Sequence, residues 1–181
     1  MMLAQKEAIT VINYLVGWFN MTRGEKVCAF IQRYCMVPEG KFVGKPLRLM
    51  VFQRDFILNI YDNKHGTSRA YLSVARKNGK SSLIAGPEAR MNSQIISGAR
   101  SRDQAALVFK LAEKMVRLSP ELGKIIRIIP SQKTLMGLPM NVEYKAISAE
   151  AGTAHGLSPV LAILDEVGQV RGPTDSFLEA I

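Results

Sequence analysis

The stretch "VARKNGKSS", residues 74–82, decides which fold this sequence predicts. It contains Gly79-Lys80-Ser81 near its end, and many phosphate-binding loops end in the same Gly-Lys-Ser or Gly-Lys-Thr sequence. It begins with Val74, whereas the usual pattern G-x-x-x-x-G-K-[ST] begins with glycine. Two interpretations are therefore open, a nucleotide-binding loop and a solvated basic turn, and the surrounding sequence has to separate them.

The sequence around this loop has the order that phosphate binding needs. A short apolar segment, residues 69–75, is a strand candidate, and a segment of helical composition follows Ser81. Backbone N–H groups at a helix start bind phosphate oxygens, a lysine such as Lys80 contacts the β- and γ-phosphates, and a hydroxyl such as that of Ser81 binds Mg²⁺. Gly79 lets the backbone approach the phosphates, and an arginine inside the loop, Arg76, can reach the γ-phosphate.

A second stretch, "LAILDE", residues 161–166, supplies the carboxylates that a nucleotide site needs in addition to a phosphate loop. Its apolar residues predict a buried strand, and ligands bind at the carboxyl ends of strands in open parallel sheets. Asp165 is suited to hold Mg²⁺ through water, and Glu166 to polarise the attacking water. Alone, this pattern is equally typical of a strand that ends in a solvated acidic turn. The two stretches together, in this order and each at a strand end, predict a P-loop NTPase.

Strand and helix candidates alternate along the chain, which indicates an α/β fold with a largely parallel central sheet flanked by helices, of the RecA/ASCE type. Further strand candidates are residues 93–100, 125–130 and 141–148. The clearest helix is residues 102–119, with Asp103 as its predicted N-cap. One apolar face is predicted for that helix, formed by Leu107, Leu111, Met115 and Leu118.

Composition narrows the class of partner. The chain has 181 residues and a formal net charge of +9, which favours a polyanion such as nucleic acid. Cys28 and Cys35 do not form a C-x-x-C pair, so they indicate reduced thiols in an intracellular protein rather than a zinc site. The apolar stretch at residues 8–19 is too short to span a membrane, and no membrane partner is expected.

The sequence resembles the large terminase subunit of tailed bacteriophages, and most of all the branch typified by phage HK97. Four stretches within residues 46–173 carry the resemblance: "ARKNGKS", "VFQRDFI", "GARSRDQA" and "TAHGLSPVLAILDE". In "ARKNGKS", Arg76 lies three positions before Gly79. In this family that arginine, rather than a first glycine, is the feature by which the loop is recognised. The resemblance implies an ATP hydrolase that uses Mg²⁺ and drives DNA packaging into the prohead.

The resemblance also implies roles for individual residues. Gln53 would hydrogen-bond adenine, although a glutamine here could equally be an exposed helix residue. Catalysis would fall to Glu166 and Arg76, and metal binding to Ser81 and Asp165. The nucleotide would be bound by Gln53 together with Arg76, Lys77, Asn78, Gly79, Lys80, Ser81 and Ser82. No arginine precedes the acidic strand, so none is assigned to act on a neighbouring subunit's ATP; Arg100, Arg102 and Arg171 remain unranked candidates.

The family further implies partners and a domain plan. The partners would be double-stranded DNA, the portal protein, the small terminase subunit and further copies in a ring, in the cytoplasm of the bacterial host. We expect an N-terminal helical segment at residues 1–45 and the ATPase domain at residues 46–181, incomplete at its C-terminus. The nuclease domain and a central strand of the sheet are expected to lie beyond residue 181, and nucleotide binding by this chain alone is expected to be weak.

Two alternatives stay open. A helicase-like DNA-dependent ATPase also has an upstream glutamine, a GKS/T loop and an Asp-Glu pair. The missing first glycine and the "HGLSP" turn at residues 155–159 favour the terminase family instead. The other alternative is a non-catalytic, prophage-derived fragment.

Overall fold

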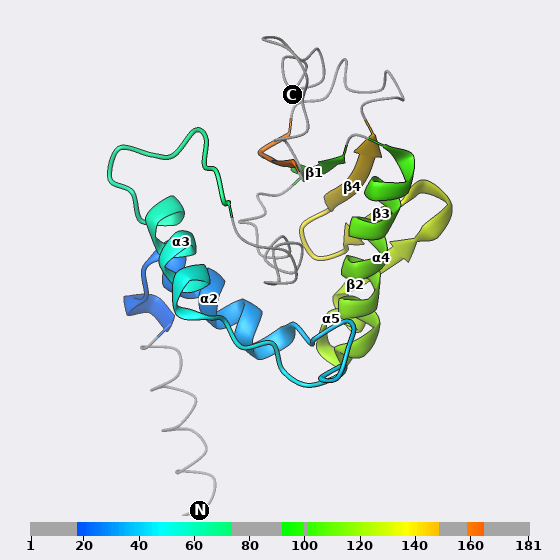
Figure 1. Cartoon of the computed structure of the whole chain (residues 1–181), viewed down its shortest axis with the longest axis horizontal. Coiled ribbons are helices and arrows are strands. Elements are labelled where there is room, and N and C mark those ends of the chain that lie inside the picture. The colour runs from blue at the N-terminus through cyan, green and yellow to red at the C-terminus, as the bar shows by residue number, and fades with distance from the viewer. Residues whose placement is uncertain (1–17, 74–91, 100, 149–158, 165–181) are drawn as a thin grey trace, which may run out of the picture.

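The computed structural model describes residues 18–73, 92–99, 101–148 and 159–164. Within these ranges the chain forms a mixed sheet, two helices packed on it and a separate pair of helices beside it (Figure 1). The helices are α2 (Arg23–Tyr34), α3 (Val51–Tyr61), α4 (Arg102–Leu118) and α5 (Pro120–Ile125), with a short 3-10 turn, η2 (Pro130–Gln132). The strands are β1 (Gln94–Ala99), β2 (Ile126–Ile129), β3 (Thr134–Gly137), β4 (Val142–Ser148) and β5 (Leu161–Leu164). None of the helices in these ranges is long and apolar enough to cross a membrane.

The sheet has the order β2-β3-β4-β1-β5. The half of the sheet that contains β4, β1 and β5 is parallel, because β1 runs parallel to both of its neighbours. The predicted α/β class with a largely parallel centre is therefore confirmed. The sheet also has an antiparallel edge, formed by β2 and β3, which was not predicted. The segment between the predicted strands 125–130 and 141–148 was expected to be only a turn, but it contains β3. Lys133, in the left-handed conformation at φ 51°, closes the turn between β2 and β3.

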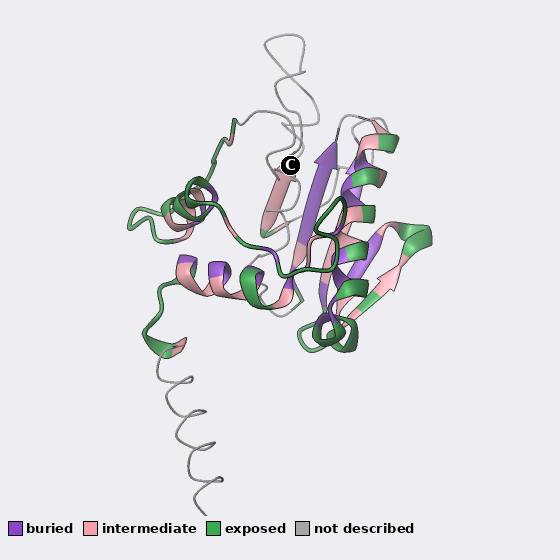
Figure 2. Cartoon of the chain, turned by 60° about the horizontal axis from the view of Figure 1, so that its bottom comes forward, coloured by how far each residue is buried: buried purple, intermediate pink, exposed green. Residues whose placement is uncertain are grey.

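Helices α4 and α5 cover one face of the sheet. Phe109, Val116 and Leu122 pack there against Leu135 of β3 and Ala146 of β4. These residues alternate along their strands with residues of the opposite face, as the pleat requires. Figure 2 shows the buried residues concentrated in the central strands, with exposed residues along the outer side of α4.

The start of α4 differs from the sequence prediction. Ser101 is the N-cap: its backbone is extended and its hydroxyl accepts a hydrogen bond from the N–H of Gln104 at 3.2 Å. Asp103 lies in the first turn instead, where a carboxylate interacts favourably with the positive end of the helix dipole.

The predicted apolar face of α4 was only partly right: Met115 is buried, but Leu107 and Leu118 are exposed. Leu107 is 60% exposed, whereas Ala105, Val108, Phe109 and Val116 are buried. The helix has apolar residues along two stripes, so periodicity alone does not say which one meets the sheet. The stripe that contains Phe109 and Val116 packs against Leu135 of β3 and Ala146 of β4.

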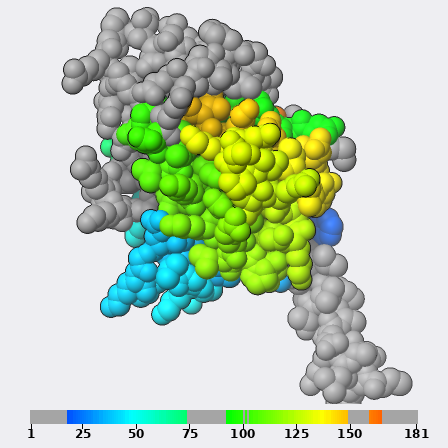
Figure 3. Space-filling model, turned by 90° about the vertical axis from the view of Figure 1, so that its right-hand side faces the viewer, coloured from blue at the N-terminus to red at the C-terminus, as the bar shows by residue number. Residues whose placement is uncertain are grey.

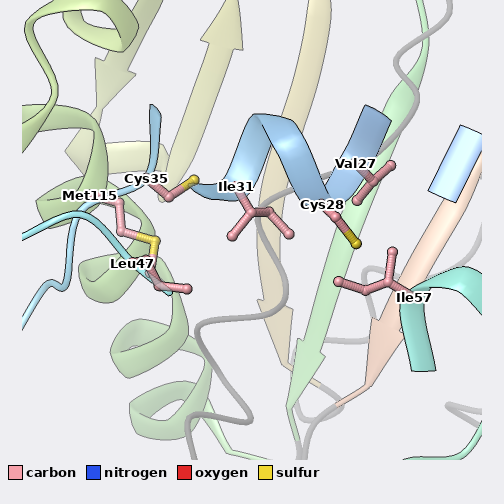
Figure 4. Packing of buried hydrophobic residues seen from close by; sticks show 7 residues of the cluster. All are labelled: Val27, Cys28, Ile31, Cys35, Leu47, Ile57 and Met115. Atoms are coloured by element: carbon pink, nitrogen blue, oxygen red, sulfur yellow. The ribbon is translucent and has the colours of Figure 1, made fainter. Parts of the chain in front are cut away.

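A second hydrophobic cluster joins the helix pair to α4. Ile31 of α2 is fully buried at its centre, with Ile57 of α3 on one side and Met115 of α4 on the other. Figure 4 shows Met115 beside Leu47 and Cys35 at one end of this cluster. Both cysteines are free, as predicted, and both are buried; burial raises the pKa of the Cys35 thiol to about 11.

A carboxylate fastens the end of α3 to the start of α2. Asp62 accepts hydrogen bonds from the Thr22 hydroxyl at 2.6 Å and from the N–H of Gly24 at 2.8 Å. These bonds hold the pKa of the Asp62 carboxyl below its ordinary value. The hydrogen bonds of Asp62 hold the end of α3 close to the start of α2, and they therefore help to fix the position of α3.

Replacing Gly24 with alanine is expected to destabilise the protein by about 1–3 kcal/mol, the usual cost of overpacking. The added Cβ would lie 2.8 Å from Asp62 Oδ2 and 3.0 Å from the backbone Cα of Leu58, so the helices would have to separate. Chemical denaturation measures the loss. Gly123→Ala in α5 is the matched control, because its Cβ meets no atom closer than 3.8 Å. Equal stability of the two variants would show that the close approach at Gly24 contributes nothing.

The strand predicted at residues 69–75 is not formed in its described part. Residues 69–73 have no regular structure, and Tyr71 is 77% exposed. Both sides of β1 are already occupied, by β4 and β5. Apolar composition predicted a strand here, but a strand needs a partner along its edge, and residues 69–73 have none within the described sheet.

Candidate active site

Three parallel strands end together at one edge of the sheet. Ala99 at the end of β1 pairs with Ser148 at the end of β4, and Gly98 pairs with Leu164 at the end of β5. In open α/β sheets ligands bind at this edge, beyond the carboxyl ends of the strands. The predicted acidic pair, Asp165 and Glu166, follows directly after Leu164 in the chain. The strand that carries this pair is thus the neighbour of β1 at the edge where chemistry is expected.

Most predicted site residues lie outside the described residues. These are Arg76, Lys77, Asn78, Gly79, Lys80, Ser81, Ser82, Asp165 and Glu166. The same holds for two of the arginine candidates, Arg100 and Arg171. Arg102 begins α4, directly after the end of β1.

Gln53 is the one predicted site residue whose surroundings are described. It is not an exposed helix residue, since only 4% of it is accessible. It occupies the third position of α3, and its side-chain oxygen Oε1 accepts a hydrogen bond from the N–H of Met50 at 2.9 Å. This bond satisfies one of the free N–H groups at the helix start, as in one half of a capping box. The bond also fixes the orientation of the amide.

Sequence reasoning missed this capping role. The usual signature places Ser or Thr at the N-cap with Gln or Glu three residues later, and here the N-cap is Met50. The glutamine at the third position was therefore the only signal. Because Gln53 caps the start of α3, it has a structural role in addition to any contact with a nucleotide.

Two hydroxyl groups meet under α4, in the sheet that supports the site: Ser97 is buried and Tyr144 is half-buried. The oxygens of Ser97 in β1 and Tyr144 in β4 are 2.7 Å apart in a hydrogen bond. Burial raises the pKa of the Tyr144 hydroxyl, so it stays protonated at neutral pH. The bond crosses the interface between β1 and β4 and holds the two strands in register where they approach the ligand edge. Ser148, buried at the end of β4, is a polar residue at that edge which sequence reasoning did not single out.

Known proteins match this chain over most of its length. A family model, the ATPase domain of the terminase large subunit, matches residues 60–175. The terminase large subunit of Enterobacteria phage HK97 is 64% identical over an alignment of 169 residues, and the match covers 89% of this chain and 34% of that protein. The crystal structure of the HK97 bacteriophage large terminase matches with a TM-score of 0.81 at 61% identity, again over 89% of this chain and 34% of that one.

The chain thus spans about a third of the length of these two relatives. The family model covers well over half of this chain, from the end of α3 to beyond β5. It includes both the loop at residues 74–82 and the acidic pair, each of which is a weak signal alone. This chain belongs to the family of terminase large-subunit ATPase domains.

Proposed function

We propose that this chain is the ATPase part of a phage DNA-packaging motor, which hydrolyses ATP with Mg²⁺ and moves double-stranded DNA into the prohead. The observation that carries the proposal is the family membership, together with the edge at which β1 and β5 end. That edge is where a parallel sheet presents a metal-binding carboxylate to a nucleotide. The partners we propose are DNA, the portal protein, the small terminase subunit and further copies in a ring, in the cytoplasm of the bacterial host.

In this proposal the phosphate loop binds the nucleotide electrostatically. Lys80 contacts the β- and γ-phosphates, and the hydroxyl of Ser81 binds Mg²⁺. Arg76 places a guanidinium near the γ-phosphate, where negative charge develops during transfer. Lys77, Asn78, Gly79 and Ser82 complete the loop, whose backbone N–H groups bind phosphate oxygens.

The acidic pair and the glutamine complete the proposed site. Asp165 would hold Mg²⁺, and Glu166 would accept a hydrogen bond from the attacking water and align that water with the γ-phosphate. Gln53 reads the adenine from α3. Mg²⁺ held by Ser81 and Asp165 would supply positive charge at the β- and γ-phosphates.

Titration of Mg-ATP into the purified chain tests the nucleotide site. We expect Lys80→Ala to weaken binding by about tenfold or more, since a charge-assisted phosphate contact contributes about 1.5–3 kcal/mol. Lys64→Ala is the matched control, because Lys64 is an exposed lysine in the loop after α3. Calorimetry or displacement of a fluorescent analogue gives both affinities. If Lys80→Ala binds as well as Lys64→Ala, the loop at residues 74–82 is not the phosphate site.

A further inference from the structure

A short hairpin between α2 and α3 projects from the molecule. Its turn, residues 38–44, is closed by backbone hydrogen bonds from the N–H of Val37 to the carbonyl of Lys45 at 2.9 Å and from the N–H of Gly44 to the carbonyl of Val37 at 3.0 Å. Gly40 and Gly44 have φ values of 88° and 78°, which side chains with a Cβ rarely adopt. We call residues 38–45 the basic loop; these bonds and glycines give it a defined conformation.

The base of this hairpin belongs to the hydrophobic core. Cys35 and Leu47 are both buried in the cluster beside Met115, and the N–H of Leu47 donates to the carbonyl of Cys35 at 2.9 Å. The side chain of Glu39 forms an ion pair with Lys114 of α4. The basic loop is therefore held against α4, and Figure 3 shows this light-blue part of the chain projecting beside the green atoms of α4.

The tip of the basic loop combines exposed apolar groups with positive charge. Phe42 is 55% exposed and Val43 is 54% exposed, and neither residue belongs to a core cluster. The ammonium groups of Lys41 and Lys45 lie 6.0 Å and 5.5 Å from the centre of the Phe42 ring. Both distances suit cation–π attraction, which gathers the two charges around one ring. The one carboxylate of the loop, that of Glu39, is already paired with Lys114.

The loop lies away from the edge where the nucleotide is expected. Helix α4 begins directly after β1 at that edge, and Lys114 comes twelve residues after Arg102. At about 1.5 Å per residue this is roughly 18 Å along the helix. Figure 1 shows the segment between α2 and α3 near α5, at the far end of the sheet from the tip of β4. The two lysines therefore do not serve the phosphates of bound ATP.

We infer that the basic loop is a contact site for the sugar–phosphate backbone of double-stranded DNA; this inference rests on the proposed function, which makes DNA the substrate. Lysine ammonium groups are flexible point charges that bind phosphates without reading base edges. The Phe42 ring supplies an apolar surface between them for the sugar edge. Such a contact is independent of sequence, as a surface past which DNA moves has to be.

Charge favours DNA over the other occupant of such a tip, a second copy of this chain. The chain carries a net charge of +9, so two copies repel each other on average, and a basic loop increases that repulsion. DNA carries a charge on every phosphate and gains from releasing its counterions.

Binding of a short DNA duplex to the purified chain, measured by fluorescence anisotropy at several salt concentrations, tests the inference. The double variant Lys41→Gln/Lys45→Gln is compared with Lys64→Gln/Arg69→Gln, which removes the same charge from exposed positions after α3. We expect the loop variant to bind about tenfold more weakly at ~0.1 M salt, and its slope of log affinity against log salt to fall by about 1.8, or ~0.9 for each lost phosphate contact. The control variant should keep the slope of the unchanged chain.

A third variant, Phe42→Ser, separates the apolar from the ionic contribution. It should weaken DNA binding and leave the salt slope unchanged, because no charge is removed. The inference is wrong if the loop and control variants lose affinity equally, or if the unchanged chain does not bind the duplex at low salt. It is also wrong if the loop variant alters only self-association in sedimentation. Mg-ATP binding, measured on the same samples, reports on the proposed nucleotide site separately and should be the same in all of them.

Discussion

Glu166→Gln is expected to reduce ATP hydrolysis by about 100-fold or more, while Mg-ATP affinity changes little. A carboxylate that orients and polarises the attacking water contributes a factor of about 10² to 10⁴ to the rate. The amide of glutamine has nearly the same shape but is a far weaker base, so the nucleotide still binds while the water is not activated. Release of phosphate under single-turnover conditions measures hydrolysis, and calorimetry measures affinity.

The neighbouring carboxylate provides the contrast that makes this test specific. Asp165→Asn should lower the dependence of ATP binding on Mg²⁺, because Asp165 is proposed to hold the metal. Glu121→Gln, at an exposed position of α5, should change neither binding nor rate. If Glu166→Gln hydrolyses ATP as fast as Glu121→Gln does, Glu166 is not the residue that activates water, and the assignment of the two carboxylates has to be revised.

Much of the parallel half of the sheet could be predicted, because each of its strands is marked by the residues of that strand and its immediate neighbours. Strands were predicted at residues 93–100, 141–148 and 161–166, and each of these segments contains an observed strand. The order of these strands could not be predicted in the same way. Gln94 pairs with Glu143, 49 residues away, and side-chain patterns do not say which distant strand becomes the neighbour.

The missed features have specific physical causes. Strand β3 has only four residues, between Lys133 and a turn, so it leaves too short an apolar pattern to recognise. The N-cap of α4 was misplaced by two residues because Ser101 and Asp103 are both good caps, and only the backbone conformation distinguishes them. The candidate site itself rested on chain order and on family resemblance, since Gln53 has no pattern of its own that indicates a nucleotide.

Gln53→Glu is expected to weaken ATP binding by about tenfold to hundredfold and to leave GTP binding nearly unchanged. An amide matches adenine by donating to one ring nitrogen while accepting from the exocyclic amine. Oε1 of Gln53 accepts a hydrogen bond from Met50 N–H, and because a carbonyl oxygen can accept two hydrogen bonds, this bond does not exclude a contact with the base. Glutamate keeps the oxygens that cap α3 but removes the donor, and an unmatched buried polar group costs about 1–3 kcal/mol.

The capping role makes a second substitution necessary. Gln53→Met fills a similar volume but removes both the cap and the base contact, so it should lose ATP selectivity and also about 1 kcal/mol of stability. Because burial raises the pKa of a carboxyl, affinities are best measured at alkaline pH, where the carboxyl group introduced by Gln53→Glu is ionised. A ratio of ATP to GTP affinity that is the same in Gln53→Glu and in the unchanged chain would mean that Gln53 only caps α3. The adenine would then have to be read by other groups, and the burial of Gln53 would be explained by the start of the helix alone.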